Sequence, residues 1–278
     1  MVDQVLVDVT DGVATITINR PEARNALNRT VRTTLPRIVR ACEADDAVDV
    51  MILTGADPAF SAGVDLKEIG AGATGGDDLR SGPDAASAAD MDMGGRNEGG
   101  ALPWRGALPP RTKLLIGAVN GVAITGGLEL ALACDFLIAS ERARFADTHA
   151  RVGVMPGWGL TVLLPQRIGV ARAREMSVTG NFVDAALAYD WGLVNHVVGH
   201  EELLAYTRQL AADSRTIDQP AVRRMLSTYE RSSLVTDVGA WVIEDEVSRT
   251  WEGSGFDPAE IERRRQGIME RGRTQTQG

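Results

Sequence analysis

The sequence is poor in the residues that build disulfide scaffolds and metal sites. It contains two cysteines, Cys42 and Cys134, and three histidines among 278 residues. Both cysteines stand in apolar stretches with helical spacing, which favours reduced, buried thiols over a disulfide. Because potential ligands are so few, we expect no metal.

Positive charge and long apolar runs are also scarce. The formal net charge is -9 and the isoelectric point is near 5.0, which argues against nucleic acid or an anionic membrane surface as the main partner. No apolar run is as long as a membrane span, and the N-terminus, MVDQVLVDVTDG, lacks the basic and apolar regions of a signal peptide. We therefore expect a cytoplasmic protein that binds neither nucleic acid nor membrane.

The apolar residues, 44% of the chain, are ample for a core and follow strand-like and helical patterns in turn. Val5–Val9 and Val13–Ile18 predict two strands joined by a turn at Thr10-Asp11-Gly12. Val50–Thr54 is continuously apolar and predicts a strand buried on both faces. This alternation of strands and helices predicts an α/β core with parallel pairing.

A helix is predicted between the second and third of these strands. Either Asn25 or Asn28 is placed to cap it, and Pro36 predicts a kink or a later true start. Further elements are expected as strands at 114–119, 136–139 and 193–198, and as helices at 160–168, 171–179 and 184–191. Beyond residue 201 only helical patterns remain, at 201–214, 219–231, 234–252 and 257–271.

Residues 70–110 differ from the rest of the chain. They are rich in Gly, Ala, Asp, Met and Pro and show no periodicity, so they cannot bury enough apolar surface to order themselves alone. We expect a mobile insertion or lid here, with Trp104 and Leu108 holding its far end.

The most informative stretch is Lys113–Ala139, KLLIGAVNGVAITGGLELALACDFLIA. A strand-like run breaks at Asn120-Gly121, and a glycine pair, Gly126-Gly127, then opens an apolar helix that carries one carboxylate, Glu129. Burying an ionised Glu costs several kcal/mol unless it is paired or functional. Glycines let backbone N–H groups approach a ligand, so the pattern predicts an anion hole beside a general base. The alternative is a tight packing turn with Glu129 exposed or paired with an arginine.

Three segments resemble the crotonase superfamily, also called the enoyl-CoA hydratase/isomerase family. They are NRPEARNAL at 19–27, AFSAGVDLKEI at 59–69 and VNGVAITGGLELALACDFLIAS at 119–140, and later blocks at 156–159 and 179–198 match in order. The resemblance implies a repeated β-β-α superhelix over residues 1–200 and a C-terminal helical region, 201–278, that forms trimers or dimers of trimers. It also implies a coenzyme A thioester as substrate, with no other cofactor.

The resemblance also implies site residues. The N–H groups of Val64 and Gly126 would form the oxyanion hole, and Glu129 would be a catalytic carboxylate. Hydratases of the family place a second carboxylate where this chain has His149. An imidazole titrates near pH 6.5, so His149 can serve as acid or base. Its alternative is a structural histidine, and Asp147 is a further candidate for the second carboxylate, or a cap.

For the substrate, the resemblance implies main-chain contacts with coenzyme A near Ala23 and Ala62 and along Val64-Asp65-Leu66-Lys67. Arg24, Lys67 and, from another subunit, Arg263–Arg265 are candidates to neutralise its phosphates. The arginine run could equally be a solvated helix face. Gly127 and Trp158 are expected near the acyl group, where Trp158 would narrow the pocket.

Three functions follow as hypotheses. The first is hydration of a trans-2-enoyl-CoA, with Glu129 as base and His149 assisting. The second keeps the oxyanion hole but performs isomerisation, dehydration of a hydroxyacyl-CoA or thioester hydrolysis, which the missing carboxylate favours. The third is a non-catalytic acyl-CoA-binding protein, against which a buried Glu129 argues because a binder has little need of that charge.

Overall fold

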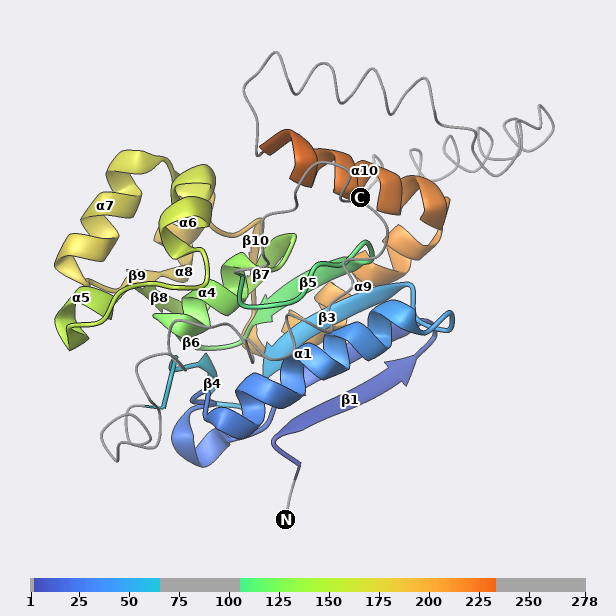
Figure 1. Ribbon diagram of the computed structural model, residues 1–278, viewed down its shortest axis with the longest axis horizontal. Helices are drawn as coiled ribbons and strands as arrows, with labels where there is room; N and C mark the ends of the chain where they lie inside the picture. The colour runs from blue at the N-terminus through green and yellow to red at the C-terminus, as the bar shows by residue number, and fades with distance from the viewer. Residues whose placement is uncertain (1–2, 66–105, 234–278) are drawn as a thin grey trace, which may run out of the picture. The chain divides into compact units, whose positions relative to one another are not determined.

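The computed structural model describes residues 3–65 and 106–233, which form two sheets flanked by helices (Figure 1). The large sheet has the strand order β1-β2-β3-β5-β7-β10, and the small sheet has the order β4-β6-β8-β9. The β1–β2 and β8–β9 pairs are antiparallel, and all other paired neighbours in these sheets are parallel. The strands are β1 (Val5–Thr10), β2 (Val13–Ile18), β3 (Val50–Gly55), β4 (Ala59–Ser61), β5 (Leu114–Val119), β6 (Val122–Ile124), β7 (Phe136–Ser140), β8 (Arg144–Ala146), β9 (Val183–Asp184) and β10 (His196–Val198).

The chain builds these sheets as a repeated unit. Strand β5 lies in the large sheet, β6 lies in the small sheet, and α4 follows them. The next three elements repeat this order: β7 lies in the large sheet, β8 lies in the small sheet, and α5 follows. The predicted β-β-α repeat and its parallel pairing are therefore confirmed. The helices are α1 (Arg29–Ala44), α4 (Gly126–Leu132), α5 (His149–Val152), α6 (Leu160–Ile168), α7 (Val170–Thr179), α8 (Ala185–Asp190), α9 (Leu203–Arg215) and α10 (Gln219–Ser233), with 3-10 turns η1 (Pro21–Ala23) and η2 (His200–Glu202).

The first hairpin forms where the sequence predicts it. Its two loop residues, Asp11 and Gly12, have positive φ angles of 48° and 70°. Positive φ at both positions is what a two-residue turn between twisted antiparallel strands requires, and Asp-Gly is well suited to it. Thr10 therefore pairs directly with Val13. The next strand, β3, is buried at every residue, as its continuous apolar run predicts.

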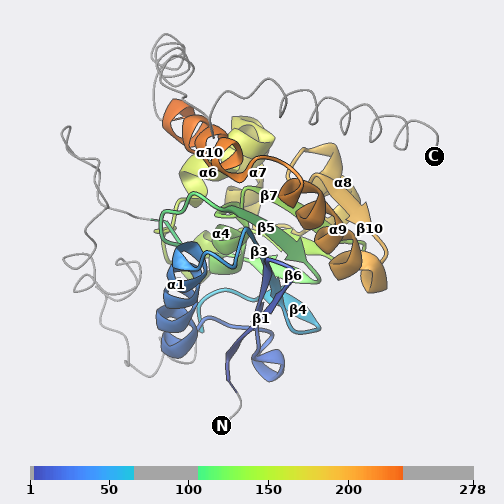
Figure 2. The same cartoon turned by 90° about the vertical axis from the view of Figure 1, so that its right-hand side faces the viewer.

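Asn28, and not Asn25, caps α1. The Asn28 side chain accepts a hydrogen bond from Val31 N over 3.0 Å, and Pro36 lies inside the helix, which excludes the later start. The apolar stripe of α1 is buried at Val31, Leu35, Val39 and Cys42. The two perpendicular views show α1 on one face of the large sheet and α9 on the other (Figure 1, Figure 2).

The closing strand expected at 193–198 is shorter than predicted. Within 193–198 only β10 forms a strand, which pairs with β7, because Leu193 N and Val194 N donate to Ala188 O and so complete the end of α8. Gly192, with φ at 80°, makes this reversal possible. The predicted helix at 160–168 has the expected bounds, and Pro165 lies inside it without ending it.

The chain divides into two compact units at residues 217 and 218. Helix α9 belongs to the first unit and packs on the large sheet, whereas α10 is the described part of the second. The helices expected at 234–252 and 257–271 lie outside the described residues, as does all but the end of the expected insertion at 70–110, including Trp104. At that end Leu108 is buried, with 4% of its surface exposed. Within residues 3–65 and 106–233, no helix combines the length and the apolar character needed to cross a membrane.

A buried lysine anchors the C-terminus of α1. Lys113 is 2% exposed, and its Nζ donates to Cys42 O over 2.9 Å and to Asp45 O over 2.7 Å. These are carbonyls that the end of a helix leaves without an intrahelical partner, and a cation there also complements the helix dipole. Lys113 immediately precedes β5, so this contact ties α1 to the central strand.

We predict that Lys113→Met lowers the free energy of unfolding by about 1–3 kcal/mol, because it removes the Nζ donor from the buried Cys42 carbonyl and leaves the Asp45 carbonyl with Val48 N alone. Urea unfolding followed by circular dichroism measures the change. Arg37→Met is the matched control, since Arg37 is an exposed cation on the same helix, and it should change the free energy by less than about 0.5 kcal/mol. Equal effects of the two substitutions would contradict the anchoring role.

Candidate active site

A pocket with about 610 Å³ of empty space, part of it open to solvent, lies at the start of α4. Four segments contribute to it: the chain after β4, the beginning of α4, α5 and the loop that follows α5. Its lining is mostly apolar, with polar side chains from two threonines, one glutamate and one histidine. The lining residues are Ala62, Val64, Thr125, Glu129, Thr148, His149, Val152, Val154, Met155, Gly157 and Trp158.

The backbone of Val64 is turned so that its N–H is available on the pocket side. Val64 forms an isolated parallel bridge with Leu27, in which Leu27 N donates to Gly63 O over 2.8 Å and Asp65 N donates to Leu27 O over 3.3 Å. In such a bridge the neighbours of Val64 make the hydrogen bonds, so its own N–H points away from Leu27. That N–H has no backbone acceptor among the residues that the structure describes.

Gly126 supplies a second amide at the same place. It is the first residue of α4, so its N–H has no partner within the helix. A Cβ built on Gly126 would lie 3.6 Å from Val64 N, and a Cβ built on Gly63 would lie 3.2 Å from Gly126 N. The two amides therefore border one small space, which the absence of side chains at these glycines keeps open.

The residue before Gly126 is strained. Thr125 has φ 56° and ψ -114°, which is a genuine outlier for a β-branched residue. Two contacts hold it there: its N–H donates to Ala146 O over 2.9 Å, and its hydroxyl lies 2.6 Å from the Thr148 hydroxyl. Gly127 packs differently, because its Cβ would lie 2.2 Å from Ser61 O. It allows α4 to approach β4 and does not line the pocket.

Glu129 is buried in the first turn of α4, with 3% of its side chain exposed. One carboxylate oxygen, Oε1, accepts a hydrogen bond from Trp158 N over 2.8 Å and a longer one from Leu160 N over 3.4 Å. The other oxygen, Oε2, lies 3.6 Å from His149 Nε2. The exposed and arginine-paired alternatives for Glu129 are therefore wrong, because backbone amides and His149 surround the carboxylate.

His149 lies between two carboxylates. Its Nδ1 is 2.7 Å from Asp147 Oδ1, and its backbone N–H donates to the same oxygen over 3.1 Å. Burial alone would lower the pKa of His149, but the hydrogen bonds with Asp147 and Glu129 and their negative charge outweigh it and raise the pKa to about 9. At neutral pH the imidazole is therefore protonated, with Nε2–H directed to Glu129 and Nδ1–H to Asp147.

Asp147 stands behind His149 and is absent from the residues that line the pocket. Burial tends to raise the pKa of this carboxyl, but hydrogen bonds from His149 and Ser177 lower it below its ordinary value. An ionised Asp147 fixes the ring orientation of His149. Sequence reasoning identified both residues, but only the structure shows that His149 faces the pocket and Asp147 supports it.

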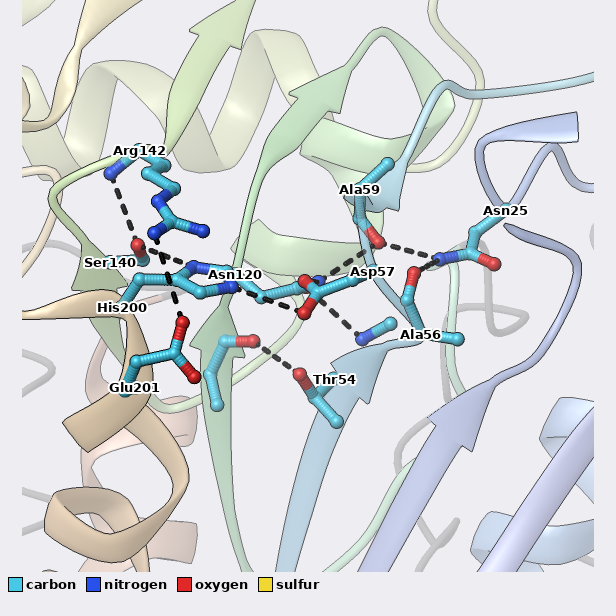
Figure 3. Close-up of polar contacts among 12 residues, drawn as sticks. Asn25, Thr54, Ala56, Asp57, Ala59, Asn120, Ser140, Arg142, His200 and Glu201 are labelled. Carbon is cyan, nitrogen blue, oxygen red and sulfur yellow. Dashed lines mark hydrogen bonds and ion pairs between the residues drawn. The ribbon is translucent and has the colours of Figure 1, made fainter. Parts of the chain in front are cut away.

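A polar network at the carboxyl ends of the large-sheet strands holds β4 in place (Figure 3). Asn25 Nδ2 donates to Ala59 O over 2.5 Å, and Asn120 Nδ2 donates to Asp57 Oδ1 over 2.8 Å. His200 continues the network, with Nε2 3.1 Å from Asp57 Oδ2 and Nδ1 3.0 Å from Ser140 Oγ. Burial by itself would raise the pKa of Asp57, but hydrogen bonds from Asn120 and His200 lower it. This network fixes the strand that leads to Val64.

The predicted coenzyme A contacts are only partly within the described residues. Arg24 lies in the turn before α1, where its carbonyl accepts from Ala62 N over 3.0 Å. Asp65 forms an ion pair with Arg20 over 3.1 Å, which holds the residue that follows Val64. Leu66, Lys67 and Arg263–Arg265 lie outside the described residues. Ala23 closes η1 and does not line the pocket.

Several lining residues were not predicted from the sequence. They include the hydroxyl pair Thr125–Thr148 and the apolar residues Val152, Val154 and Met155. The four-residue helix α5 places Val152 there, and it is too short to leave a periodic signal. Thr148 directly precedes His149 in the sequence, and this was the one feature that could have predicted it as a pocket residue.

Potential metal ligands are dispersed. Across residues 3–65 and 106–233, no three His, Cys, Asp or Glu side chains are placed to hold one ion. His196 and His200 are four residues apart, but His196 packs on the Tyr206 ring at 5.4 Å whereas His200 belongs to the polar network. Both Cys42 and Cys134 are buried free thiols, and burial raises the pKa of Cys134 to about 12.

Known proteins share this arrangement over most of the chain. The model of the family described as "Enoyl-CoA hydratase/isomerase" matches residues 8–88 and 104–246. An Arabidopsis thaliana protein named "Probable enoyl-CoA hydratase 1, peroxisomal" is 36% identical, over 94% of this chain and 91% of its own length. The Escherichia coli protein named "1,2-epoxyphenylacetyl-CoA isomerase" is 34% identical, over 86% and 87% of the two chains.

Solved structures agree with the sequence relatives. The crystal structure of an enoyl-CoA hydratase from Mycobacterium smegmatis has 44% sequence identity and a TM-score of 0.70, covering 89% of this chain and 98% of that one. The family match extends over both sheets and over every residue that borders the pocket. The chain therefore belongs to the enoyl-CoA hydratase/isomerase family, that is, to the crotonase superfamily.

Proposed function

We propose that this protein is an enoyl-CoA hydratase, a lyase that adds water across the double bond of a trans-2-enoyl-CoA. One observation carries the proposal: Val64 lines the pocket that Glu129 and His149 face, and its amide borders one small space together with the neighbouring Gly126 amide, neither having a backbone partner among the described residues. Relatives named as hydratases support it.

In this proposal the two amides form an oxyanion hole. The thioester carbonyl oxygen accepts hydrogen bonds from Val64 N–H and Gly126 N–H, and these strengthen as the oxygen becomes an enolate. Because both donors belong to rigid backbone, they need no reorganisation during the reaction. The backbone contacts that hold Thr125 in its strained conformation and the close packing of Gly63 against Ile124 O preserve their position.

Glu129 and His149 move the protons. Glu129 removes a proton from water as the oxygen bonds to the β-carbon, and the protonated His149 delivers a proton to the α-carbon of the enolate. The product gains one water, while Glu129 is left protonated and His149 neutral. Oε2 and Nε2 are 3.6 Å apart, so a proton passed from Glu129 to His149 restores both groups. Asp147 keeps the imidazole oriented and charged. No metal or redox cofactor enters this reaction.

Isomerisation is the second candidate function. It is favoured by the single carboxylate that faces the pocket and by the relative named as an isomerase. An isomerase moves one proton between carbon atoms and needs no activated water. Purified protein given crotonyl-CoA and a 3-enoyl-CoA separately distinguishes the two reactions, since hydration consumes the first and isomerisation the second. Tight acyl-CoA binding without turnover would support the third hypothesis, a non-catalytic binder.

The remaining proposals concern the substrate, assembly and location. The coenzyme A portion would lie against Ala23, Arg24 and the segment from Ala62 to Lys67. Residues 201–278 would form the oligomerisation region of a homotrimer or a dimer of trimers. The cytoplasmic location stays a prediction, since the Arabidopsis relative carries a peroxisomal name.

We predict that Glu129→Gln lowers kcat for crotonyl-CoA hydration by about 10² to 10⁴, the usual contribution of a positioned acid–base group. The amide side chain keeps the size of the carboxylate but cannot accept the proton of water. Loss of enoyl absorbance measures the rate, and binding of butanoyl-CoA tests whether the pocket is intact. Hydration at the wild-type rate in Glu129→Gln would refute the assignment of Glu129 as base.

The proposed acid role of His149 predicts an alkaline limit. Since its pKa is raised to about 9, kcat/KM should be constant from neutral pH up to about 9 and fall about tenfold per pH unit above it. Asp147→Asn removes the negative partner at Nδ1, so the pKa of His149 falls and the limit moves to lower pH. A purely structural role for Asp147 would reduce activity without moving the limit.

The same substitution series tests whether His149 replaces a carboxylate. His149→Ala should abolish the alkaline limit together with most of the activity. His149→Glu should restore hydration in part if a carboxylate can act at this position. A pH profile that still shows the limit near pH 9 in either variant would exclude His149 as its source.

The raised pKa of His149 also contributes to the free energy of unfolding. This contribution is fully present below the ordinary pKa of 6.5 and is lost progressively as the pH rises through about 9.

We predict that Gly63→Ala lowers kcat/KM by about 10² to 10³, the usual effect of losing one oxyanion-hole donor. The new Cβ would lie 2.7 Å from Ile124 O at a φ of 85°, so the backbone must shift beside Val64 N. Gly192→Ala is the matched control, because its φ is 80° but its Cβ would make only an ordinary contact of 3.5 Å. That variant should lose stability and keep its activity. Equal losses of kcat/KM in both would contradict the proposed hole.

A further inference from the structure

A second, smaller cavity lies behind the substrate pocket. It has about 270 Å³ of empty space, part of it open to solvent, and is formed mainly by α1, α4 and the chain just before β5. Its lining is apolar except for one arginine, and consists of Leu27, Val31, Arg32, Leu35, Pro36, Ala107, Leu130 and Trp158. Trp158 also lines the substrate pocket, so its side chain borders both spaces.

The indole of Trp158 forms the wall between them. The residue is 6% exposed, and its ring atom Cζ3 would lie 3.1 Å from a Cβ built on Gly126. The ring is therefore pressed against the rim of the space that the Val64 and Gly126 amides border. This large side chain therefore stands between the two spaces that it lines.

The backbone and side chain of Trp158 serve different purposes. Its backbone N–H donates to Glu129 Oε1 over 2.8 Å, and any non-proline residue would provide that donor. The indole Nε1 is buried and has no hydrogen-bond partner among the residues that the structure describes. Buried indole N–H groups usually find an acceptor, so no polar contact accounts for tryptophan here. Substitution of the side chain consequently removes the wall and spares the hydrogen bond to Glu129.

We propose that Trp158 determines the acyl-chain specificity of this protein by closing the substrate pocket, and that the apolar cavity behind it is a binding site for the distal methylenes of a longer acyl chain once the indole is removed. The proposal rests on the proposed acyl-CoA function. The wild-type protein accordingly takes short acyl groups. The competing path for a long chain runs past Met155, which is 77% exposed, into solvent.

Binding of saturated acyl-CoA esters tests this without relying on turnover. Isothermal titration with butanoyl-, hexanoyl-, octanoyl- and decanoyl-CoA gives affinity against chain length. In the wild type, affinity should stop rising after the shortest members. In Trp158→Ala it should rise by about fourfold for each methylene that becomes buried, and enoyl-CoA turnover should shift to longer chains in parallel.

Two further variants make the assignment specific. Val31→Phe in the Trp158→Ala background places a ring in the second cavity and should remove the gain for long chains. Trp191→Ala is the matched control, because Trp191 is a partly buried tryptophan that lines neither space, and it should keep the wild-type dependence on chain length. If Trp158→Ala does not fold, Trp158→Phe tests the proposal instead. It should also raise the affinity for longer acyl chains, but by a smaller factor.

The possible failures are distinguishable. If the wild type binds no acyl-CoA at all, the proposed function itself is wrong. If it binds and hydrates crotonyl-CoA but the Trp158 variants keep the wild-type chain-length profile, only the role of Trp158 is refuted. A wild type that already gains affinity up to decanoyl-CoA would show that long chains leave past Met155, and this would also overturn the proposal.

Discussion

The carboxylate of Glu129 is the constraint on which the rest of the site depends. An ionised group with almost no exposure costs several kcal/mol unless its environment compensates for it. Here the compensation comes from separate parts of the chain: two backbone amides at 158 and 160 bind one oxygen, and a protonated His149 faces the other. These partners fix the loop between α5 and α6 against α4. The same contacts that stabilise the charge therefore shape the pocket around it.

The backbone amides of the site also depend on contacts with other parts of the chain. Among the described residues the Val64 amide has no backbone acceptor because its neighbours bond to Leu27, and the Gly126 amide has none because it begins a helix. Both positions are unfavourable to hold in isolation, as the φ angle of Thr125 shows. The polar network of Asn25, Asn120 and His200 and the parallel strands beneath it supply the rigidity that keeps them in place. The large sheet acts as the support, and the small sheet carries the site.

Trp158 shows how one residue can serve two independent purposes. Its main chain belongs to the charge-stabilising shell of Glu129, whereas its ring divides apolar space into two parts. Main-chain hydrogen bonds constrain the side chain little, so a substitution at this position can change the ring and keep the hydrogen bond to Glu129. Hydratase and isomerase names among the relatives show that the chemistry of the fold is also variable. In this chain a histidine, His149, faces the pocket beside Glu129.

Local patterns determined much of this protein. The alternation of apolar runs predicted the strands and helices, the Asp-Gly turn fixed the first hairpin, and the glycine pair before Glu129 identified a buried carboxylate beside free amides. Tertiary structure alone decided which groups hold that carboxylate, that Asp147 supports His149 while His149 faces the pocket, and that Trp158 separates two cavities. It also decided that residues 193 and 194 end α8 instead of extending β10. The reason is physical: periodicity and turn chemistry act over a few residues, whereas burial, hydrogen-bond partners and pKa values depend on segments that meet only after the chain has folded.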